Sequence, residues 1–420
     1  MPDRVTLPPF ELATYVVNDV VEGSPARWNA GRLHVDVVAL ASSTADPALA
    51  EIHLDVVRPG DAVRVANVLD AVLPDVKVAD PDRTFPGALG ALAQSGHGRT
   101  NRVGGLSVLS VCDWLAAGYT TEDGSPDSLV DMNGPGAGIT RWGSTINVVV
   151  RCVPADGAPI GDVDRAVRRA SLRIARDIAA TTLDRDPDSV ESFSAPAVDV
   201  DPGLPAVCGI LQVASEGPLT DTFLYGRAVG GIDPTVIDPF ELLDGALTNG
   251  AYDWPAVRNV TATYQDSSLV RTLLAGHGEQ LRFAGLILAL GYLDSSFEKQ
   301  RSAMLSARLA RLLGADGAIC TTFSSGNSHT DTMLTVKACE SLGIRTTAII
   351  SETNGGLTDH VAEADSIVSV GNEDELVDPW SPERVVGAAT AVRSGEPVPT
   401  WAYLGACVET GDMSLTAVPA

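Results

Sequence analysis

Short stretches of apolar residues, broken by polar turns, run through the first part of the chain and predict strands. Residues 32–40 (RLHVDVVAL), 51–59 (EIHLDVVRP) and 106–114 (LSVLSVCDW) are rich in β-branched residues and are bounded by Gly, Asp and Pro. Residues 146–154 (INVVVRCVP) predict a buried strand. Over residues 162–183 the apolar positions recur at steps of three and four, which predicts an amphipathic helix. Together these elements indicate a β-rich α+β unit.

The later part of the chain alternates strand and helix patterns. Strands are expected over residues 206–214, 283–292, 317–323, 344–351 and 366–371. Helices are expected between the later of these strands, over residues 296–314, 329–342 and 359–364. Such alternation is typical of a parallel, doubly wound sheet with helices on both faces. The stretch before it is dense in Asp, Pro and Ser and has no apolar period, so it predicts a linker. We therefore expect a β-rich α+β domain over residues 1–184, a linker over 185–205 and an α/β parallel-sheet domain over 206–420.

Composition narrows the class of protein. Hydrophobic residues make up 45% and charged residues 20%, which is typical of a globular chain. The formal net charge of −25 disfavours nucleic acid and anionic membrane as partners. None of the six Cys lies in a C-x-x-C pair, and the start of the chain does not have the pattern of a signal peptide. We expect reduced thiols in a cytoplasmic protein.

The common sequence signatures of nucleotide and metal sites are missing. There is no G-x-G-x-x-G after a strand, no P-loop, no H-E-x-x-H and no G-x-S-x-G. The six His are isolated from one another along the sequence, and each fits a hydrogen-bonded or surface role better than a metal ligand. No cofactor is predicted from these patterns.

Two stretches offer groups that could bind a carboxylate. The turn DMNGPGAG contains Asn133, Gly134 and Gly136, whose backbone N–H groups could hold an anion; equally, the glycines could serve only the turn. The loop SGHGRTNR contains Arg99, which suits bidentate carboxylate binding but could also be an ion-pair partner in so acidic a chain.

A third candidate follows a predicted strand and opens a predicted helix. The loop TTFSSGNSHTD carries Ser324, Ser325, Asn327 and Asp331, and polar groups at a helix N-terminus form an anion site or simply cap the helix. The loop over residues 351–360 occupies the equivalent place after the next strand. Two such loops at one edge of the sheet predict a pocket wall.

Taken in order, the motifs of the chain resemble the precursor of the α and β subunits of component B of glycine, sarcosine and betaine reductases. The order and spacing of the segments carry this resemblance: HLDVVRPGDAVRVANVLDAVLPDVKV, FPGALG, SGHGRT, DMNGPGAG, INVVV, GPLTDTFLYG, LLDGAL, HGEQLRFAGLI, LGADG, FSSGNSHTDTML and LGACVETGDMSLTAV.

The resemblance implies a mechanism. In the family, the precursor cleaves itself before a Cys and leaves a pyruvoyl group, whose carbonyl condenses with the substrate amine. A selenocysteine or cysteine of a partner subunit then attacks the α-carbon and displaces the amine. In this chain the Asn-Cys pair of the family aligns with Ala251 and Tyr252. Because Tyr252 cannot perform the N-to-S or N-to-O shift, we expect an uncut chain without a pyruvoyl group.

The hypothesis from the sequence is a substrate-positioning subunit of a hetero-oligomeric, reductase-like complex. It would cleave a C–N or C–X bond of a small amino-acid-like or carboxylate substrate, with the thiol or selenol lent by a partner subunit. The loops at Asn133 and Ser324, with Arg99, Thr220 and Asp221, are the expected substrate contacts.

Two alternatives remain open from the sequence. The chain could belong to a repurposed hydrolase or ring-opening enzyme, with zinc held by dispersed residues such as His97, His329 and His360. It could also be a non-catalytic scaffold that binds a small carboxylate.

Overall fold

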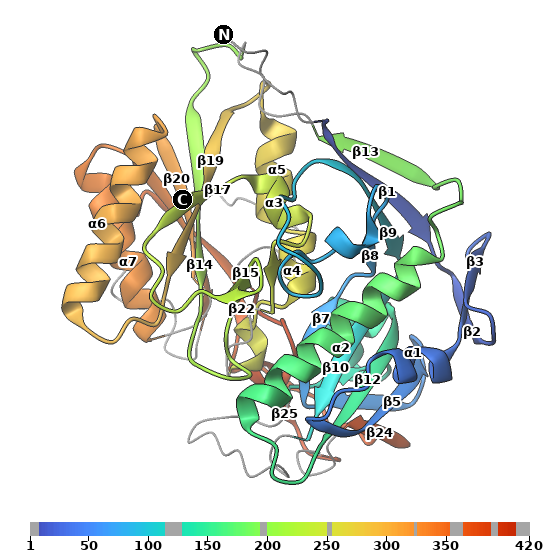
Figure 1. Cartoon of the computed structure of the whole chain (residues 1–420). Helices are drawn as coiled ribbons and strands as arrows, with labels where there is room; N and C mark the ends of the chain where they lie inside the picture. Colours follow the sequence, from blue (N-terminus) through green and yellow to red (C-terminus); the bar gives the residue numbers. More distant parts are fainter. Residues whose placement is uncertain are drawn as a thin grey trace.

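The computed structural model in Figure 1 describes residues 8–113, 128–193, 200–249, 254–322, 326–352, 364–387 and 394–408. It is a mixed α/β structure, as the sequence predicts. Most strands of the first part of the chain, blue to cyan in Figure 1, lie on the right, and most later strands lie on the left with the orange helices, whereas the late strand β24 lies at the lower right.

The first part is built on two four-stranded sheets, with the orders β13-β1-β9-β8 and β5-β12-β10-β7. In the second of these, β10 and β12 run parallel, and β7 and β5 flank them in the antiparallel direction. The strands are β1 (Phe10–Val16), β5 (Leu49–Val57), β7 (Val68–Val72), β8 (Asp75–Lys77), β9 (Gly98–Gly104), β10 (Leu106–Cys112), β12 (Ile146–Pro154) and β13 (Ser189–Phe193). Smaller sheets use β2 (Asp19–Glu22), β3 (Arg27–Asn29), β4 (Arg32–Val35), β6 (Val63–Ala66) and β11 (Val130–Asp131).

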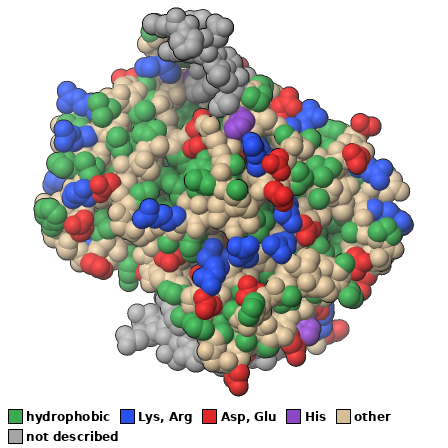
Figure 2. All heavy atoms as spheres, in the orientation of Figure 1, with side chains coloured by type: hydrophobic (Ala, Val, Ile, Leu, Met, Phe, Trp, Pro, Cys, Tyr) green, Lys and Arg blue, Asp and Glu red, His purple; other side chains and the backbone are tan. Residues whose placement is uncertain are grey.

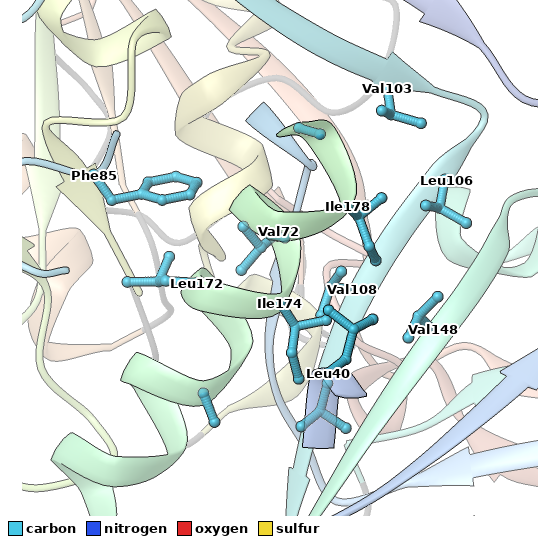
Figure 3. Close-up of a cluster of buried hydrophobic side chains, with 14 of the residues drawn as sticks. Leu40, Val72, Phe85, Val103, Leu106, Val108, Val148, Leu172, Ile174 and Ile178 are labelled. Carbon is cyan, nitrogen blue, oxygen red and sulfur yellow. The ribbon is translucent and has the colours of Figure 1, made fainter. Parts of the chain in front are cut away.

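Helix α2 (Ile160–Ala180) covers this second sheet and matches the predicted amphipathic helix. Its buried positions Val163, Val167, Ala170, Ile174 and Ile178 follow the helical repeat and join one hydrophobic core. Figure 3 shows side chains of α2 facing those of β7, β10 and β12. The burial of this face holds the helix on the sheet.

The later part contains a six-stranded sheet with the order β17-β19-β14-β20-β21-β22. Its parallel strands are β14 (Ala206–Val213), β19 (Arg282–Leu290), β20 (Gly317–Thr321), β21 (Arg345–Glu352) and β22 (Ser366–Asn372), and β17 (Thr235–Ile237) runs antiparallel at the edge. In chain order the parallel strands have the doubly wound arrangement 2-1-3-4-5. The chain order therefore reverses between β14 and β20.

Helices cover both faces of this sheet. Helices α6 (Ser296–Leu312) and α7 (Asn327–Ser341) pack on the face that presents Ile210 and Ile287, and α5 (Ser268–Gly276) packs on the face that presents Leu211 and Leu286. Adjacent residues of a strand point to opposite faces, so each strand serves two cores. The remaining short helices and strands are α1 (Val37–Ser43), α3 (Pro239–Leu243), α4 (Thr261–Gln265), β15 (Phe223–Leu224), β16 (Arg227–Ala228), β18 (Leu247–Thr248), β23 (Leu376–Val377), β24 (Arg384–Gly387) and β25 (Val398–Pro399), with the 3-10 helices η1 (Pro81–Arg83), η2 (Pro135–Gly138), η3 (Arg141–Ser144), η4 (Pro255–Val257) and η7 (Thr400–Ala402).

Some predicted elements differ in the structure. The strand expected over residues 32–40 ends at Val35, because the Asp36 side chain accepts a hydrogen bond from the Ala39 N–H at 2.9 Å and starts helix α1. Part of the expected linker is strand β13, which pairs antiparallel with β1. The helix expected over residues 359–364 falls almost wholly outside the described residues.

Segments from the later part of the chain pair and pack with segments from the first part. Strand β24 pairs parallel with β6, and one hydrophobic core joins Val65 and Trp142 to Val260 and Leu404. Residues from the two expected domains thus share a core. The division at residues 185–205 remains a prediction.

None of the helices in the described ranges combines the length and the apolar character that a membrane crossing requires.

We expect Ile174→Ala to lower the free energy of unfolding by about 2–5 kcal/mol, because Ile174 is fully buried and its truncation leaves a cavity. The matched control is Val38→Ala in α1, where the side chain is 72% exposed and little should change. Urea unfolding of both variants measures the difference. Equal midpoints for the two variants would contradict the assignment of this core.

Candidate functional site

The loop that follows β14 lies at the carboxyl end of the sheet, at the position where the chain order reverses. Ligands of doubly wound sheets bind outside these strand ends. The loop is shaped by Asp221, whose Oδ1 accepts hydrogen bonds from Ser215 Oγ at 2.7 Å and from the Gly217 N–H at 3.0 Å. Thr220 Oγ1 donates to the Gly217 carbonyl at 3.2 Å. Thr220 and Asp221, which the sequence predicts as substrate contacts, therefore make hydrogen bonds that fix the conformation of this loop.

Asn249 links this loop to Thr261, at the start of helix α4, by hydrogen bonds. Its side-chain Nδ2 donates to the Asp221 carbonyl at 3.3 Å, and its backbone N–H donates to Thr261 Oγ1 at 2.7 Å. The side chain is 3% exposed, and the backbone has a φ of +45°. Residues 250–253, which contain Ala251 and Tyr252, follow at once and lie outside the described residues. Asn249 is thus the last described residue before residues 250–253.

A buried carboxylate continues this chain of hydrogen bonds. Thr261 Oγ1 donates to Asp70 Oδ2 at 2.7 Å, and the Thr261 N–H donates to Asp70 Oδ1 at 2.8 Å. Removal from water raises the pKa of Asp70 to about 6, although the bonds from Thr261 and the charge of Arg168 act in the opposite direction. The site therefore contains a carboxyl group that can hold or release a proton near neutral pH.

Several polar atoms around Asn249 have unused hydrogen-bonding capacity. Asn249 Oδ1 and Thr248 Oγ1 are buried without a hydrogen-bond partner among the described residues. The hydroxyls of Tyr264 and Thr222 are neighbours, but their geometry falls short of a hydrogen bond. Burial raises the pKa of Tyr264, so this hydroxyl remains a donor. Because buried polar groups are normally paired, these atoms have capacity for further hydrogen bonds.

A second group of side chains comes after residues 250–253. The Trp254 and Trp401 rings pack at a centroid distance of 5.2 Å and an angle of 33°. Glu373 is buried, accepts a hydrogen bond from Ser351 Oγ, and has a pKa raised by its burial. Glu373 and Ser351 lie at the carboxyl end of β21 and β22. Glu373 therefore places a buried carboxyl group beside Trp254, the first described residue after residues 250–253.

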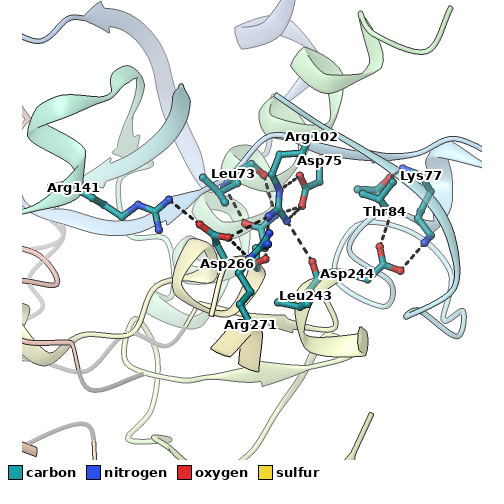
Figure 4. Close-up of polar contacts among 12 residues, drawn as sticks. Leu73, Asp75, Lys77, Thr84, Arg102, Arg141, Leu243, Asp244, Asp266 and Arg271 are labelled. Atoms are coloured by element: carbon teal, nitrogen blue, oxygen red, sulfur yellow. Dashed lines mark hydrogen bonds and ion pairs between the residues drawn. The ribbon is translucent and has the colours of Figure 1, made fainter. Parts of the chain in front are cut away.

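Buried ion pairs hold the segment that carries these groups. Arg102 donates to both oxygens of Asp75 at 2.8 and 2.7 Å, and Gln265 Nε2 donates to Asp75 Oδ2 at 2.6 Å. Lys77 Nζ donates to Asp244 Oδ2 at 2.6 Å. Figure 4 shows how these bonds, with those of Arg141 and Arg271 to Asp266, link the first part of the chain to the segment around α3 and α4. The segment around Asn249 and Thr261 is thereby fixed against β7.

The structure places the predicted glycine turn in a packing role. Asn133 Nδ2 donates to the Gly60 carbonyl at 2.9 Å, and Asn133 Oδ1 accepts from the Gly134 N–H at 2.7 Å. A Cβ atom on Gly134 would lie 2.7 Å from the ring of Trp380. A Cβ atom on Gly136 would lie 2.3 Å from an oxygen of Asp131. Both glycines let the turn approach its neighbours closely, which favours the packing interpretation over an anion site.

Arg99 pairs with Glu11 at 2.9 Å across the neighbouring strands β9 and β1, so it acts as an ion-pair partner. Asp331 accepts from Lys299 Nζ at 2.8 Å and from the Leu293 N–H at 3.2 Å, and burial raises its pKa. Asn327 Nδ2 donates to the Leu293 carbonyl at 3.4 Å. Asn327 and Asp331 thus tie α7 to the loop after β19, while Ser324 and Ser325 lie outside the described residues.

The three histidines of the zinc alternative do not form a described cluster. His97 Nδ1 lies 3.4 Å from the Ser95 carbonyl oxygen, and His329 is buried in α7. His360 lies outside the described residues. Within the parts of the chain that the structure describes, no group of three or more His, Cys, Asp and Glu side chains is placed to hold a metal ion.

Asp70, Thr261 and Tyr264 were missed as site residues by the sequence analysis. The signal was present for Asp70, because a carboxylate interrupts the apolar strand VLDAV, all of which is buried. A charged residue at a position that the strand pattern buries requires a partner. That partner, Thr261, is 191 residues away along the chain, and no motif in the sequence around it indicates this role.

We expect Asp70→Asn to change how stability depends on pH. The folded-state pKa of about 6 is above the ordinary value of 3.8 for an Asp side chain, so the folded chain binds this proton more tightly than the unfolded chain does. The stability that this proton contributes is present below pH 4 and is lost as the pH rises through 6. At about 1.4 kcal/mol per pH unit, the loss is roughly 3 kcal/mol.

Urea unfolding of the unchanged chain and of Asp70→Asn at several pH values between 4 and 7.5 measures this loss. The difference in unfolding free energy between the two chains should change by that amount across the range. A difference that stays constant would show that Asp70 has an ordinary pKa.

Comparisons with known proteins agree with the resemblance seen in the sequence. Residues 9–398 match the family described as glycine/sarcosine/betaine reductase component B subunits. The glycine reductase complex component B subunits alpha and beta of Acetoanaerobium sticklandii are 29% identical over 389 residues, covering 90% of this chain and 88% of the relative. The betaine reductase complex component B subunit alpha of Peptoclostridium acidaminophilum is 30% identical, covering 88% and 85%. The sarcosine reductase subunit alpha of the same organism is 28% identical, covering 90% and 89%. No solved structure matches the chain. The chain belongs to the family of glycine/sarcosine/betaine reductase component B subunits.

Proposed function

We propose that this chain is the substrate-positioning subunit of a hetero-oligomeric, reductase-like complex that cleaves a C–N or C–X bond of a small amino-acid-like or carboxylate substrate. The thiol or selenol nucleophile comes from a partner subunit, and the chain makes no pyruvoyl group. The observation that carries the proposal is the buried polar cluster of Asp70, Thr261, Asn249, Thr248 and Tyr264 beside residues 250–253.

The sequence of the cleavage region supports the absence of a pyruvoyl group. Ala251 and Tyr252 align with the Asn-Cys pair of the family. Self-cleavage before a residue needs a side-chain oxygen or sulfur that can attack the adjacent carbonyl and form a small ring. The phenol oxygen of Tyr252 is held away from that carbonyl by its rigid ring.

The cysteines of the chain support a nucleophile from elsewhere. All six Cys are buried. Burial raises the pKa of Cys152 and Cys208 to about 12, and a hydrogen-bonded neighbour, Cys339, together with burial raises that of Cys320. Because the thiolate is the reactive form, these residues are poor nucleophiles. A thiolate or selenolate that attacks the substrate is therefore assigned to a partner.

The roles of the cluster follow from its hydrogen-bonding capacity. The hydroxyls of Thr248 and Tyr264 can donate to a substrate carboxylate, and Asn249 Oδ1 can accept from an amine or hydroxyl. In the proposed step the partner's thiolate forms a bond to the α-carbon, the C–N bond breaks, and its electron pair leaves with the amine. The amine takes up its proton from solvent, and Asp70 holds Thr261, and through it Asn249, in position by hydrogen bonds.

The first test is the intact mass of the purified chain. We expect a single species of 43.7 kDa that does not react with carbonyl reagents such as phenylhydrazine. Two fragments divided near residue 250, the second beginning with a keto acid, would refute the absence of a pyruvoyl group.

The second test is a complex with the product of the neighbouring gene that carries a Cys or selenocysteine motif. We expect a stable complex, and Thr261→Val should lower its turnover of small carboxylate substrates by about 10–100-fold, because valine lacks the hydroxyl that joins Asn249 to Asp70 and positions the cluster. The control is Thr235→Val in the edge strand β17, which should keep full activity. Absence of a complex, or equal activity of the two variants, would contradict the proposal.

A further inference from the structure

Helix α6 presents large apolar side chains on the side that faces away from the sheet. The residues of α6 that are buried against the sheet and α7 are small, namely Ala303, Ser306, Ala307 and Ala310. By contrast, Phe297, Met304 and Leu312 are 71%, 49% and 82% exposed. A surface helix normally turns its large apolar residues inward. This helix therefore has a second apolar face without a partner among the described residues.

A groove runs between the last turns of α6 and α7. It has a volume of about 740 Å³ and is lined by Met304, Ala307, Arg308, Arg311, Leu312, Ala338, Ser341 and Leu342. Most of these side chains are apolar, and none of the described residues that line it is acidic. We call this surface the α6–α7 groove. An exposed apolar groove of this kind is typical of a protein-binding site.

The charge of the groove differs from that of the chain as a whole. The chain carries a net charge of −25, and many of its arginines are in ion pairs, as Arg301 is with Asp233. Arg308 and Arg311 form no ion pair with any described residue. Figure 2 shows basic and apolar side chains, with some acidic ones among them, along the left edge of the molecule, where α6 lies. An occupant of the groove is therefore expected to carry apolar residues flanked by carboxylates.

The groove is at the opposite edge of the sheet from the candidate site. The last turns of α6 and α7 lead into the starts of β20 and β21, which are the amino ends of these strands. The loops around Asp221 and Asn249 follow the carboxyl end of β14. A partner in the groove would leave the candidate site open. The groove thus has a different role from the surface that receives the thiol-bearing subunit.

We propose that the α6–α7 groove docks an acidic amphipathic helix of another protein. Two parallel helices with apolar residues between them accept a third helix through side chains spaced by three and four residues. Met304, Leu312 and Leu342 receive the apolar face of that helix, and Arg308 and Arg311 pair with its carboxylates. A second copy of this chain in a symmetric contact fits less well, because it would place these arginines against their own counterparts.

The test uses the full chain and two designed helical peptides of roughly 20 residues. One peptide has Leu at positions spaced by three and four and Glu elsewhere; the other has Lys in place of Glu. Fluorescence anisotropy should show that the acidic peptide binds at least about tenfold more tightly than the basic one, and that added salt weakens its binding. Equal binding of the two peptides, or no binding of the acidic one, would overturn the proposal.

Variants on exposed positions locate the binding. The double variant Arg308→Glu and Arg311→Glu should reverse the preference so that the basic peptide binds more tightly. Leu312→Asp should abolish binding, and Leu376→Asp, at a 64% exposed position of β23, is the matched control. Circular dichroism should show each variant folded as the unchanged chain is.

Two further outcomes would refute the docked helix. The proposal fails if Leu312→Asp and Leu376→Asp bind the acidic peptide equally well. It also fails if sedimentation shows a dimer of the unchanged chain that Leu312→Asp alone dissociates, because the groove would then be occupied by a second copy. Neither outcome depends on the activity of the candidate site, so the two proposals fail separately.

Discussion

Three buried carboxylates decide how the first and second parts of the chain meet. Asp70, Asp75 and Asp244 are 2%, 3% and 6% exposed. A carboxylate that has lost its water must be compensated by hydrogen bonds or by a positive charge. Each carboxylate has at least one partner in the other part of the chain: Asp70 has Thr261, Asp75 has Gln265 in addition to Arg102 of its own part, and Asp244 has Lys77 and Thr100. These pairings determine where the segment around Asn249 and Thr261 lies, and removal of either partner leaves an uncompensated polar group.

The two ends of the six-stranded sheet differ in the kind of side chain that they present. At the carboxyl end of the six-stranded sheet, polar groups are concentrated, and some of their atoms have no hydrogen-bond partner among the residues that the structure describes. At the amino end, α6 covers the sheet with small residues and exposes its large ones. The cysteines lie in neither surface, because all are buried within the cores. Their burial is the reason why the proposed function assigns the reactive sulfur or selenium to another protein.

Several site residues could be found from the sequence, but their roles could not. Thr220 and Asp221 do lie in the loop at the end of β14, where the chain order reverses. Gly134, Gly136 and Arg99 were equally visible, yet the first two serve close packing and the third pairs with Glu11. A glycine-rich turn has the same sequence whether its N–H groups face a ligand or the turn packs against a ring. Only the position of Trp380 and Asp131 distinguishes the two.

The sequence by itself determined the local periodicity, the parallel strands of the later part, the membership of the family and the absence of a Cys at position 252. These features follow from short-range patterns and from the order of motifs along the chain. The tertiary structure alone decided that Asp70 lies against Thr261, that β24 pairs with β6, and that β13 joins the first sheet. The periodicity of apolar residues predicts which side chains are buried. The partner of a buried polar group depends on contacts between residues far apart in the chain, and no local pattern predicts those contacts.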